Sequence, residues 1–340
     1  MSLADYHATT GNWREQLQRN ERKTRLVIIT FITVYIIVGL VVDVFVLQSL
    51  YPNTTLAQCF KALLTLQVIP YATLLMLVIA VVSLLITYAL YDRIMLLGTD
   101  SREITPDTAK NLQEKQLYNV VEEMKVAAGM QYMPKIFIIE ANYMNAFASG
   151  YSEKSAMMAI TSGLIAKLDR SELQAVMAHE LSHIRHHDIK LTLMVAILSN
   201  ILLIVIDVLF YTVLFKRDRR EDNRLLTIII VLRYILPLIT IILALFLSRT
   251  REFMADSGSV ELMRNNEPMA RALLKISQDH QTHAEQYKQE YGQTAHEQVR
   301  QASYLFDPSA IDPVKSLNSA FSTHPSIDKR LAALGFISKK

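Results

Sequence analysis

Four long apolar stretches constrain the fold of this 340-residue chain more than any other feature. They run from Leu26 to Leu50, from Val68 to Tyr91, from Leu191 to Phe215 and from Leu225 to Ser248. A helix of about 20 apolar residues is long enough to cross the hydrocarbon core of a bilayer, and each stretch exceeds that length. The sequence therefore predicts a mainly α integral membrane protein that crosses the lipid bilayer with four transmembrane helices.

Charge and cysteine content exclude several other classes of protein. The formal net charge is only +3, and the basic residues lie mainly beside the apolar stretches, where membrane topology accounts for them. The sequence contains no nucleic-acid-binding motif, so we expect no nucleic acid partner. The single cysteine, Cys59, excludes an intramolecular disulfide and any metal site built from cysteines.

The distribution of Lys and Arg predicts the orientation of the membrane helices. Residues 1–25 contain several Arg and Lys side chains, whereas the loop at residues 51–67 contains only Lys61. By the positive-inside rule the N-terminal tail lies in the cytoplasm, and residues 92–190 return there after two crossings.

Two charged residues within the last two apolar stretches are expected to pair. Asp207 and Arg233 lie at equal distances from the loop that joins these stretches, so an antiparallel hairpin places them at nearly the same depth. Because an isolated charge in hydrocarbon costs at least about 2.5 kcal/mol, we predict that they pair or share a polar cavity. Asp43, nearer the outer end of the first stretch, is expected to reach interfacial water.

The segments outside the apolar stretches have the patterns of an α+β domain. An apolar helical repeat over residues 117–124 ends at Gly129, and two apolar runs at 135–140 and 156–161 predict paired strands around a turn-rich connection. Ser171 and Gln174 fit a capping box and predict the start of the next helix.

Residues 281–301 are polar and rich in Gln, Glu and His. This composition predicts a solvated helix or a mobile insertion. We accordingly expect His280, His283 and His296 to lie on a solvated face.

The helix predicted after Ser171 contains HELSH at residues 179–183, which fits the zinc-hydrolase pattern H-E-x-x-H. Residues four apart lie nearly above one another on a helix, so both imidazoles can reach one metal ion while Glu180 projects beside it. A catalytic zinc activates a water molecule, and Glu180 is the candidate base for its proton. Asp188 is expected to cap or orient the end of this helix.

A catalytic zinc also needs a third protein ligand, and Glu252 and Asp256 are the candidates. Being four residues apart, they face the same side of a helix. Glu252 would bind the metal, and Asp256 would accept the other N–H of a ligand imidazole, that of His179 rather than His183. The alternative is that both are surface carboxylates that form salt bridges with neighbouring arginines.

Four motifs in this order resemble one known family. They are NAFASG at residues 145–150, HELSHIRHHD at 179–188, REFMAD at 251–256 and THPSIDKRLAAL at 323–334. The chain is similar to the membrane metallopeptidases that include the bacterial heat-shock protease HtpX and the CaaX prenyl endopeptidases, and the similarity covers most of its length.

The resemblance implies a zincin-like (gluzincin) catalytic domain that binds one Zn²⁺ ion per chain. His179, His183 and Glu252 match the zinc ligands of the family, and Glu180 matches its general base.

The resemblance also implies residues that bind the substrate. His324 and Arg330 match a His and an Arg that help to hold the substrate and its carbonyl. We expect the polypeptide to add as a strand along the edge near Asn145, Ala146 and Phe147, although Asn145 could equally be a turn residue.

Glu252 must meet His179 on one side of the membrane, so residues 191–248 must cross it twice or not at all. The loop that joins the two stretches is basic, which the positive-inside rule would keep in the cytoplasm. The hairpin is therefore either shallow or a pair of full crossings against the charge bias. We favour two crossings because both stretches are long enough to span the bilayer.

These expectations combine into a bacterial inner-membrane endopeptidase with a cytoplasmic catalytic domain. The predicted segments are 1–25 (basic tail), 26–91 (membrane helices 1 and 2), 92–190 (first catalytic part), 191–248 (membrane hairpin) and 249–340 (second catalytic part). The resemblance implies that the substrates are unfolded, misfolded or damaged membrane proteins, as in stress-related quality control. The alternatives are a CaaX-type prenyl endopeptidase, which would need more membrane helices than four, and a non-catalytic membrane scaffold.

Overall fold

The computed structural model describes residues 3–8, 13–79, 81, 82, 85, 100–150, 152–186, 188–215, 223–293, 304, 305 and 324–338. Three features of the sequence analysis lie outside these residues in whole or in part: the end of the stretch Val68–Tyr91, the basic loop at 216–222, and His296.

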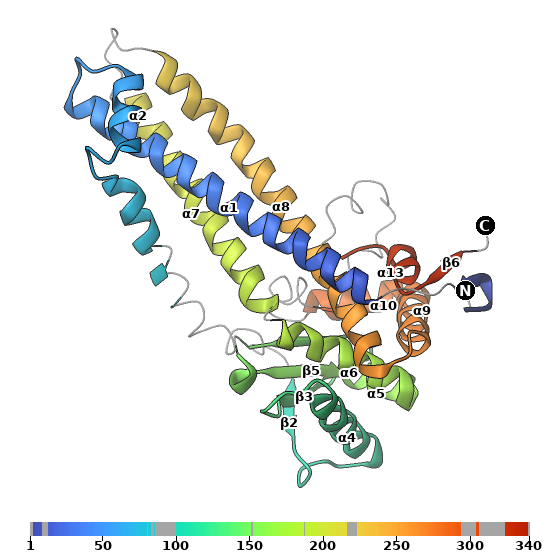
Figure 1. Cartoon of the computed structure of the whole chain (residues 1–340). Helices are drawn as coiled ribbons and strands as arrows, with labels where there is room; N and C mark the ends of the chain where they lie inside the picture. Colours follow the sequence, from blue (N-terminus) through green and yellow to red (C-terminus); the bar gives the residue numbers. More distant parts are fainter. Residues whose placement is uncertain are drawn as a thin grey trace. The chain divides into compact units, whose positions relative to one another are not determined.

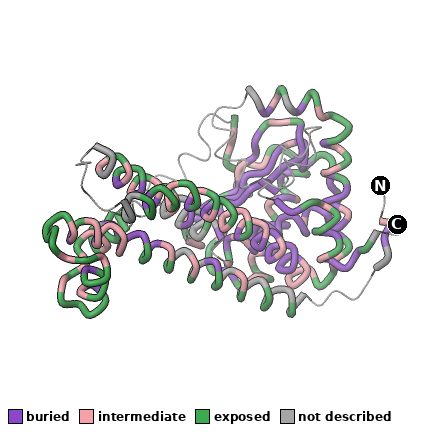
Figure 2. The backbone as a smooth tube through the Cα atoms, turned by 90° about the horizontal axis from the view of Figure 1, so that it is seen from above, coloured by how far each residue is buried: buried purple, intermediate pink, exposed green. Residues whose placement is uncertain are grey.

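The chain divides into two compact units, each built from segments that are distant in sequence. Unit 1 comprises Met1–Lys23, Leu90–Leu191 and Leu247–Lys340. Unit 2 comprises Thr24–Ala89 and Thr192–Phe246, and it contains most of the long apolar stretches. In Figure 2 the buried residues gather in the sheet of unit 1 and in the helices that pack on it.

Long helices dominate unit 2. The helices α1 (Trp13–Leu50), α7 (Asp188–Phe215) and α8 (Asn223–Met263) contain parts of it, together with the short α2 (Leu56–Leu64) and a helical segment at residues 71–79 (Figure 1). In the described part of the chain, two helices are long and apolar enough to cross a membrane, at Arg25–Leu50 and Thr227–Met263. α7 contributes only a shorter apolar segment, Ser199–Thr212, so the number of four crossings stays a prediction.

The predicted pair within the apolar helices is confirmed. Arg233 Nε lies 2.9 Å from Asp207 Oδ1, and the guanidinium carbon of Arg233 lies 4.0 Å from the centre of the Phe210 ring. Each charge is therefore neutralised by a partner on the facing helix of the same unit.

Asp43 does not reach interfacial water as expected. It is buried, with 4% of its surface exposed, and its carboxylate accepts hydrogen bonds from Ala72 N (2.8 Å), Thr73 N (3.1 Å) and Thr73 Oγ1 (2.6 Å). These amides open the helical segment at residues 71–79, where they have no partner within the helix. Asp43 thus caps this segment from α1.

The sheet of unit 1 has four strands in the order β2-β3-β5-β4, with β4 at one edge. The strands are β2 (Ser101–Ile104), β3 (Lys135–Ile139), β4 (Ala146–Ser149) and β5 (Met157–Thr161). The two predicted strands do pair, but in parallel, because the connection between them forms β4, which pairs with β5 in antiparallel fashion. The prediction of a mere turn-rich connection was wrong, since the small residues of NAFASG pack as a buried strand.

Helices cover this sheet. α4 (Leu112–Ala127) buries the predicted apolar repeat and ends before Gly129, whose φ of +67° suits glycine. α6 (Arg170–Arg185) follows the short α5 (Ser162–Lys167), and α9 (Glu267–Thr282) packs beside α6.

The polar stretch after residue 280 is only partly solvated. α10 (Ala284–Gln293) packs Tyr287 and Tyr291 against the sheet beside Phe147 and Tyr143. His280 is fully buried, its Nε2 lies 3.2 Å from Tyr291 Oη, and burial lowers its pKa to about 4. The expectation of a solvated His280 was wrong because Tyr287 and Tyr291 of α10 pack beside it. The polar composition of the stretch as a whole gave no indication of this packing.

The two ends of the described chain meet in unit 1. β1 (Tyr6–Ala8) pairs in antiparallel fashion with β6 (Phe336–Ser338), directly after the short helix α13 (Ile327–Ala333). A second link, at 3.4 Å, is the hydrogen bond that Tyr6 Oη donates to Asp328.

Replacing Arg233 by Leu is expected to lower the yield of folded protein, because Asp207 then remains as an unpaired charge at a cost of about 2.5 kcal/mol or more. The double change with Asp207→Leu removes both charges and should restore part of the yield. The measurement is the monodisperse fraction after detergent extraction, with its melting temperature. A double variant no better than Arg233→Leu would show that the pair does not support assembly.

Candidate metal centre

The HELSH sequence lies in the C-terminal half of α6, and the helix begins with a strong cap. Asp169 accepts a hydrogen bond from Glu172 N, and the Glu172 carboxylate accepts one from Asp169 N, which completes a capping box. The predicted box of Ser171 and Gln174 was therefore misplaced by two residues. The apolar flank of α6 is buried, which holds the helix firmly against the sheet and α4: Leu173, Val176, Met177, Leu181 and Ile184.

α8 brings Glu252 and Asp256 to α6 through a close contact between the two helices. A Cβ atom at Gly258 would lie 2.0 Å from Ser182 Oγ, so only glycine fits against the HELSH helix at this point. One residue further on, Ser259 Oγ donates a hydrogen bond of 2.7 Å to the carbonyl of Ala175. Small residues on α8 thus allow Asp256 and Glu252, two and six residues before Gly258, to reach the imidazoles of α6.

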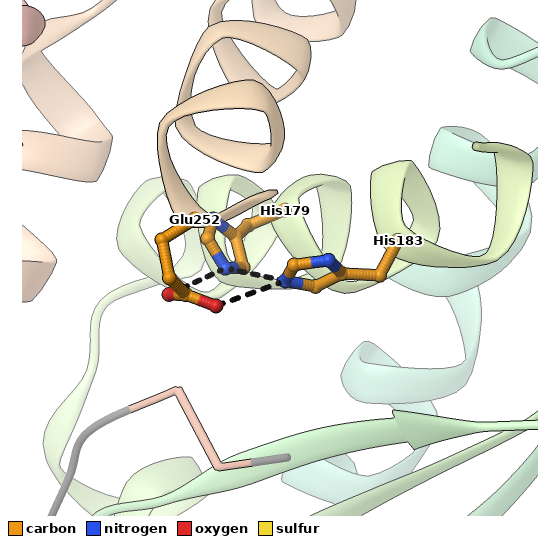
Figure 3. Close-up of side chains that lie close together, drawn as sticks. All are labelled: His179, His183 and Glu252. Carbon is orange, nitrogen blue, oxygen red and sulfur yellow. Dashed lines mark hydrogen bonds and ion pairs between the residues drawn. The ribbon is translucent and has the colours of Figure 1, made fainter. Parts of the chain in front are cut away.

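The side chains of His179, His183 and Glu252 converge on one point (Figure 3). The two Nε2 atoms lie 3.2 Å apart, Glu252 Oε1 lies 3.6 Å from His183 Nε2, and Glu252 Oε2 lies 3.9 Å from His179 Nε2. Ligands of a tetrahedral zinc are separated by about 3.4 Å, given bonds of about 2.1 Å. The separations and the donor types therefore fit a zinc ion.

A buried carboxylate stands behind each imidazole. Asp256 Oδ1 lies 3.1 Å from His179 Nδ1, and Asp188 Oδ2 lies 2.9 Å from His183 Nδ1. A carboxylate at Nδ1 favours the tautomer whose Nε2 carries a lone pair, which is the form that binds a metal. The two Nε2 atoms are only 3.2 Å apart, so they need a shared cation between them, which can be a proton or a metal ion.

Asp188 has a larger role than the sequence suggested. It pairs with His183 and, through its other oxygen, with the buried guanidinium of Arg251 on α8. Sequence reasoning placed a carboxylate behind His179 only. The position of Asp188 in HELSHIRHHD, at the start of α7, was the available signal for the second carboxylate.

Glu180 lies inside the same site, with 1% of its surface exposed. Burial raises the pKa of this carboxyl to about 7, against the opposing effects of the His183 imidazole and of a hydrogen bond from the backbone amide of Ala148. A group with a pKa near neutrality can both accept and release a proton at working pH. Glu180 is therefore a buried carboxyl group that can exchange a proton near neutral pH.

The nearby carboxylates favour positive charge at His183. Burial alone would lower the pKa of this imidazole, but the hydrogen bond to Asp188 and the charge of Glu252 raise it to about 9. The same negative environment would stabilise a bound cation.

His324 and Arg330 lie beside Glu252, the third candidate ligand. His324 Nδ1 is 3.2 Å and Arg330 Nη1 is 3.3 Å from Glu252 Oε2. Arg330 is buried and donates to both oxygens of Asp256, at 2.9 and 2.7 Å, and to the carbonyl of Leu305 at 2.9 Å. Arg330 thus holds the carboxylate behind His179, and contact of either residue with a substrate stays a prediction.

The predicted substrate edge belongs to β4 and to the residue before it. Asn145 is buried; its side-chain amide donates to Tyr291 Oη at 3.1 Å, and its Oδ1 accepts from Ala146 N at 3.1 Å. Phe147 is buried against the tyrosines of α10. The Ala146 carbonyl accepts a hydrogen bond from Leu305 N at 2.9 Å, so a distant part of the chain already lies on this edge.

Comparisons with known proteins identify the proteins that this chain resembles. The sequence model of Peptidase family M48 matches residues 111–337. A "Protease HtpX homolog" of Helicobacter acinonychis is 39% identical over 323 residues, covering 95% of this chain and 98% of that protein, and one of Streptococcus uberis is 32% identical over 332 residues, covering 94% and 98%. Among solved structures, S. mikatae Ste24p aligns at 16% identity with a TM-score of 0.49, covering 94% of this chain and 66% of that one.

Replacing Asp188 by Asn is expected to weaken zinc binding about 10- to 100-fold, because the amide no longer fixes the His183 tautomer or compensates Arg251. The measurement is the zinc dissociation constant from chelator competition. Asp107→Asn, an exposed carboxylate in a loop, is the matched control and should bind zinc as wild type does. Unchanged affinity in Asp188→Asn would contradict its role behind His183.

Replacing Gly258 by Ala is expected to destabilise the protein by about 1–3 kcal/mol through overpacking and to weaken zinc binding as α8 moves away from α6. Removing the opposing side chain with Ser182→Gly in the same protein should restore much of both properties. Melting temperature and zinc affinity are the measurements. If Gly258→Ala alone matches wild type, the close contact does not set the position of Glu252.

Proposed function

This chain belongs to peptidase family M48 and is a metalloprotease, and from that premise we propose that it is a zinc-dependent endopeptidase of the bacterial inner membrane that cuts unfolded or damaged membrane proteins at the cytoplasmic face. The observation that carries this proposal is the buried convergence of His179, His183 and Glu252 with Glu180 beside them. Such a peptidase serves protein quality control, as expected under stress.

The proposed membrane arrangement has four crossings with the catalytic residues on one side. Two long apolar helices support the first and last crossings. Many large apolar side chains of unit 2 are more than half exposed, which suits contact with lipid chains: Ile29, Leu75, Ile204, Val208 and Leu238. The positively charged tail supports a cytoplasmic orientation.

Different residues of the chain bind the metal ion and orient its ligands. His179, His183 and Glu252 would hold the ion, with Asp256 and Asp188 fixing the two imidazoles. A zinc ion bound there supplies a Lewis acid and lowers the pKa of water toward about 7.

Proton transfer falls to Glu180. Its carboxylate takes a proton from the attacking water and then delivers it to the nitrogen of the leaving amine. The pKa near 7 makes both transfers feasible in one catalytic cycle. We assign to His324, whose Nδ1 lies 3.2 Å from Glu252 Oε2, the donation of a hydrogen bond to the oxygen of the scissile carbonyl.

The substrate would lie along the outer edge of β4 as an added strand. Main-chain hydrogen bonds provide most of the recognition in this mode, so many sequences can bind if they are extended. A folded domain cannot present such a strand, which explains a preference for unfolded or damaged proteins.

Replacing Glu180 by Gln is expected to leave zinc content unchanged and to reduce cleavage of an unfolded polypeptide about 10²- to 10⁴-fold, because the amide cannot accept the proton. Reduced and carboxymethylated lactalbumin is a suitable substrate, with products followed by mass spectrometry and zinc by atomic absorption. Glu123→Gln, a half-exposed glutamate on α4, is the matched control. Equal cleavage by wild type and Glu180→Gln would remove Glu180 as the base.

A further inference from the structure

Tyr304 and Leu305 lie on the edge of β4, although they follow it by more than 150 residues in the sequence. Both residues are buried, each with 1% of its surface exposed. Leu305 N donates to the carbonyl of Ala146 at 2.9 Å, and the carbonyl of Leu305 accepts from Arg330 Nη1 at 2.9 Å. Both backbone groups of Leu305 are thus bound, one by β4 and one by the metal centre's arginine.

The contact uses the backbone positions that an added strand would need. Thr161 N donates to the carbonyl of Asn145 at 3.0 Å, so this residue pair is hydrogen-bonded in the β4–β5 ladder. In an antiparallel pair, hydrogen-bonded and non-hydrogen-bonded residues alternate, so the backbone groups of Ala146 and Ala148 point away from β5. The carbonyl of Ala146 is one of these outward-facing groups, and it accepts the hydrogen bond from Leu305 N.

The two side chains leave this segment toward different parts of the core, as in a strand. The ring of Tyr304 packs against three aromatic rings, with centroid distances of 5.7 Å to Phe147, 6.0 Å to Tyr291 and 6.5 Å to Tyr143. Leu305 instead joins the main core that contains α6 and α9. The ring of Tyr304 is therefore buried among three aromatic side chains at the edge of the sheet.

The carbonyl of Leu305 lies close to the metal ligands. The nitrogen that binds it, Arg330 Nη1, is also 3.3 Å from Glu252 Oε2. A single guanidinium nitrogen thus joins this carbonyl to the third ligand. A polypeptide bound at this site is expected to donate a backbone N–H to β4 and to place a carbonyl near the metal centre. The backbone of Leu305 makes both interactions.

We propose that Tyr304 and Leu305 occupy the position of the substrate on β4, so that a polypeptide binds by displacing them. An aromatic side chain of the polypeptide then enters the space that the Tyr304 ring now occupies. This inference rests on the proposed peptidase activity of the same site. It adds a selective subsite, lined by Phe147, Tyr143 and Tyr291, to a mode of binding that otherwise tolerates many sequences.

Kinetics of full-length, zinc-loaded protein in detergent test the displacement. Tyr304→Ala removes the aromatic anchor of the segment, so KM for a peptide should fall about tenfold with kcat unchanged, because a larger fraction of the protein is competent to bind. Tyr304→Phe keeps the ring and is the matched control, with KM near that of wild type. A KM in Tyr304→Ala equal to or above that of wild type would overturn the proposal.

The substrates for this experiment are ten-residue peptides in which one Phe is moved along an otherwise Ala- and Ser-containing sequence. Cleavage should occur at a constant distance from the Phe, and the peptide without Phe should be cut more slowly. Cleavage positions that do not follow the Phe would overturn the aromatic subsite.

A second readout needs no catalysis and keeps Tyr304 in place. In the Glu180→Gln protein, saturating amounts of the best Phe-containing peptide should accelerate hydrogen exchange at the amide of Leu305, which Ala146 now protects. Unchanged protection would overturn the displacement even if wild type cleaves peptides. Conversely, absence of cleavage by wild type would count against the peptidase function, while the exchange result would still decide whether a peptide and this segment compete.

Discussion

The approach of α8 to α6 is the contact on which the metal centre depends. The two imidazoles and Glu180 come from one helix, but the third ligand lies about seventy residues later on another. A carboxylate side chain is short, so Glu252 reaches its place only if the two backbones come unusually close. Gly258 against Ser182 permits that distance, and the bond from Ser259 to the Ala175 carbonyl fixes the rotation of α8 about its axis.

Buried charge accounts for much of the remaining architecture. Four carboxylates in the site are buried, those of Glu180, Asp188, Glu252 and Asp256, whereas Arg251 and Arg330 are its buried guanidinium groups. With every carboxylate ionised and the imidazoles neutral, the described residues leave an excess of two negative charges. Uncompensated buried charge is costly, and a divalent cation balances this excess. The two arginines thus leave the site with a negative charge that a divalent cation would balance.

The parts of this protein that follow short-range rules could be predicted from sequence. Residue spacing along a helix placed both histidines of HELSH on one face, and apolar periodicity identified the buried side of α4. Residue spacing also predicted that Asp207 and Arg233, on two consecutive apolar helices, form an ion pair.

Features that depend on which segments meet in space could not be predicted. NAFASG has the composition of a turn, yet it forms a strand because β5 offers a partner for its backbone. His280 lies in a polar stretch, yet α10 folds its tyrosines over it. Leu305 contacts Ala146, but no pattern in the sequence around either residue indicates that the two segments meet.

The pairing of β1 with β6 has a consequence for the order of events during synthesis. Residues 6–8 are synthesised more than 300 residues before their partners at 336–338. Arg330, which holds Asp256 behind His179, lies just before that final strand. A growing chain therefore carries HELSH for much of its translation without the residues that complete the site. An incomplete chain in which α6 has already folded thus lacks the guanidinium that fixes Asp256, and its metal centre takes its full form only after α13 has been made.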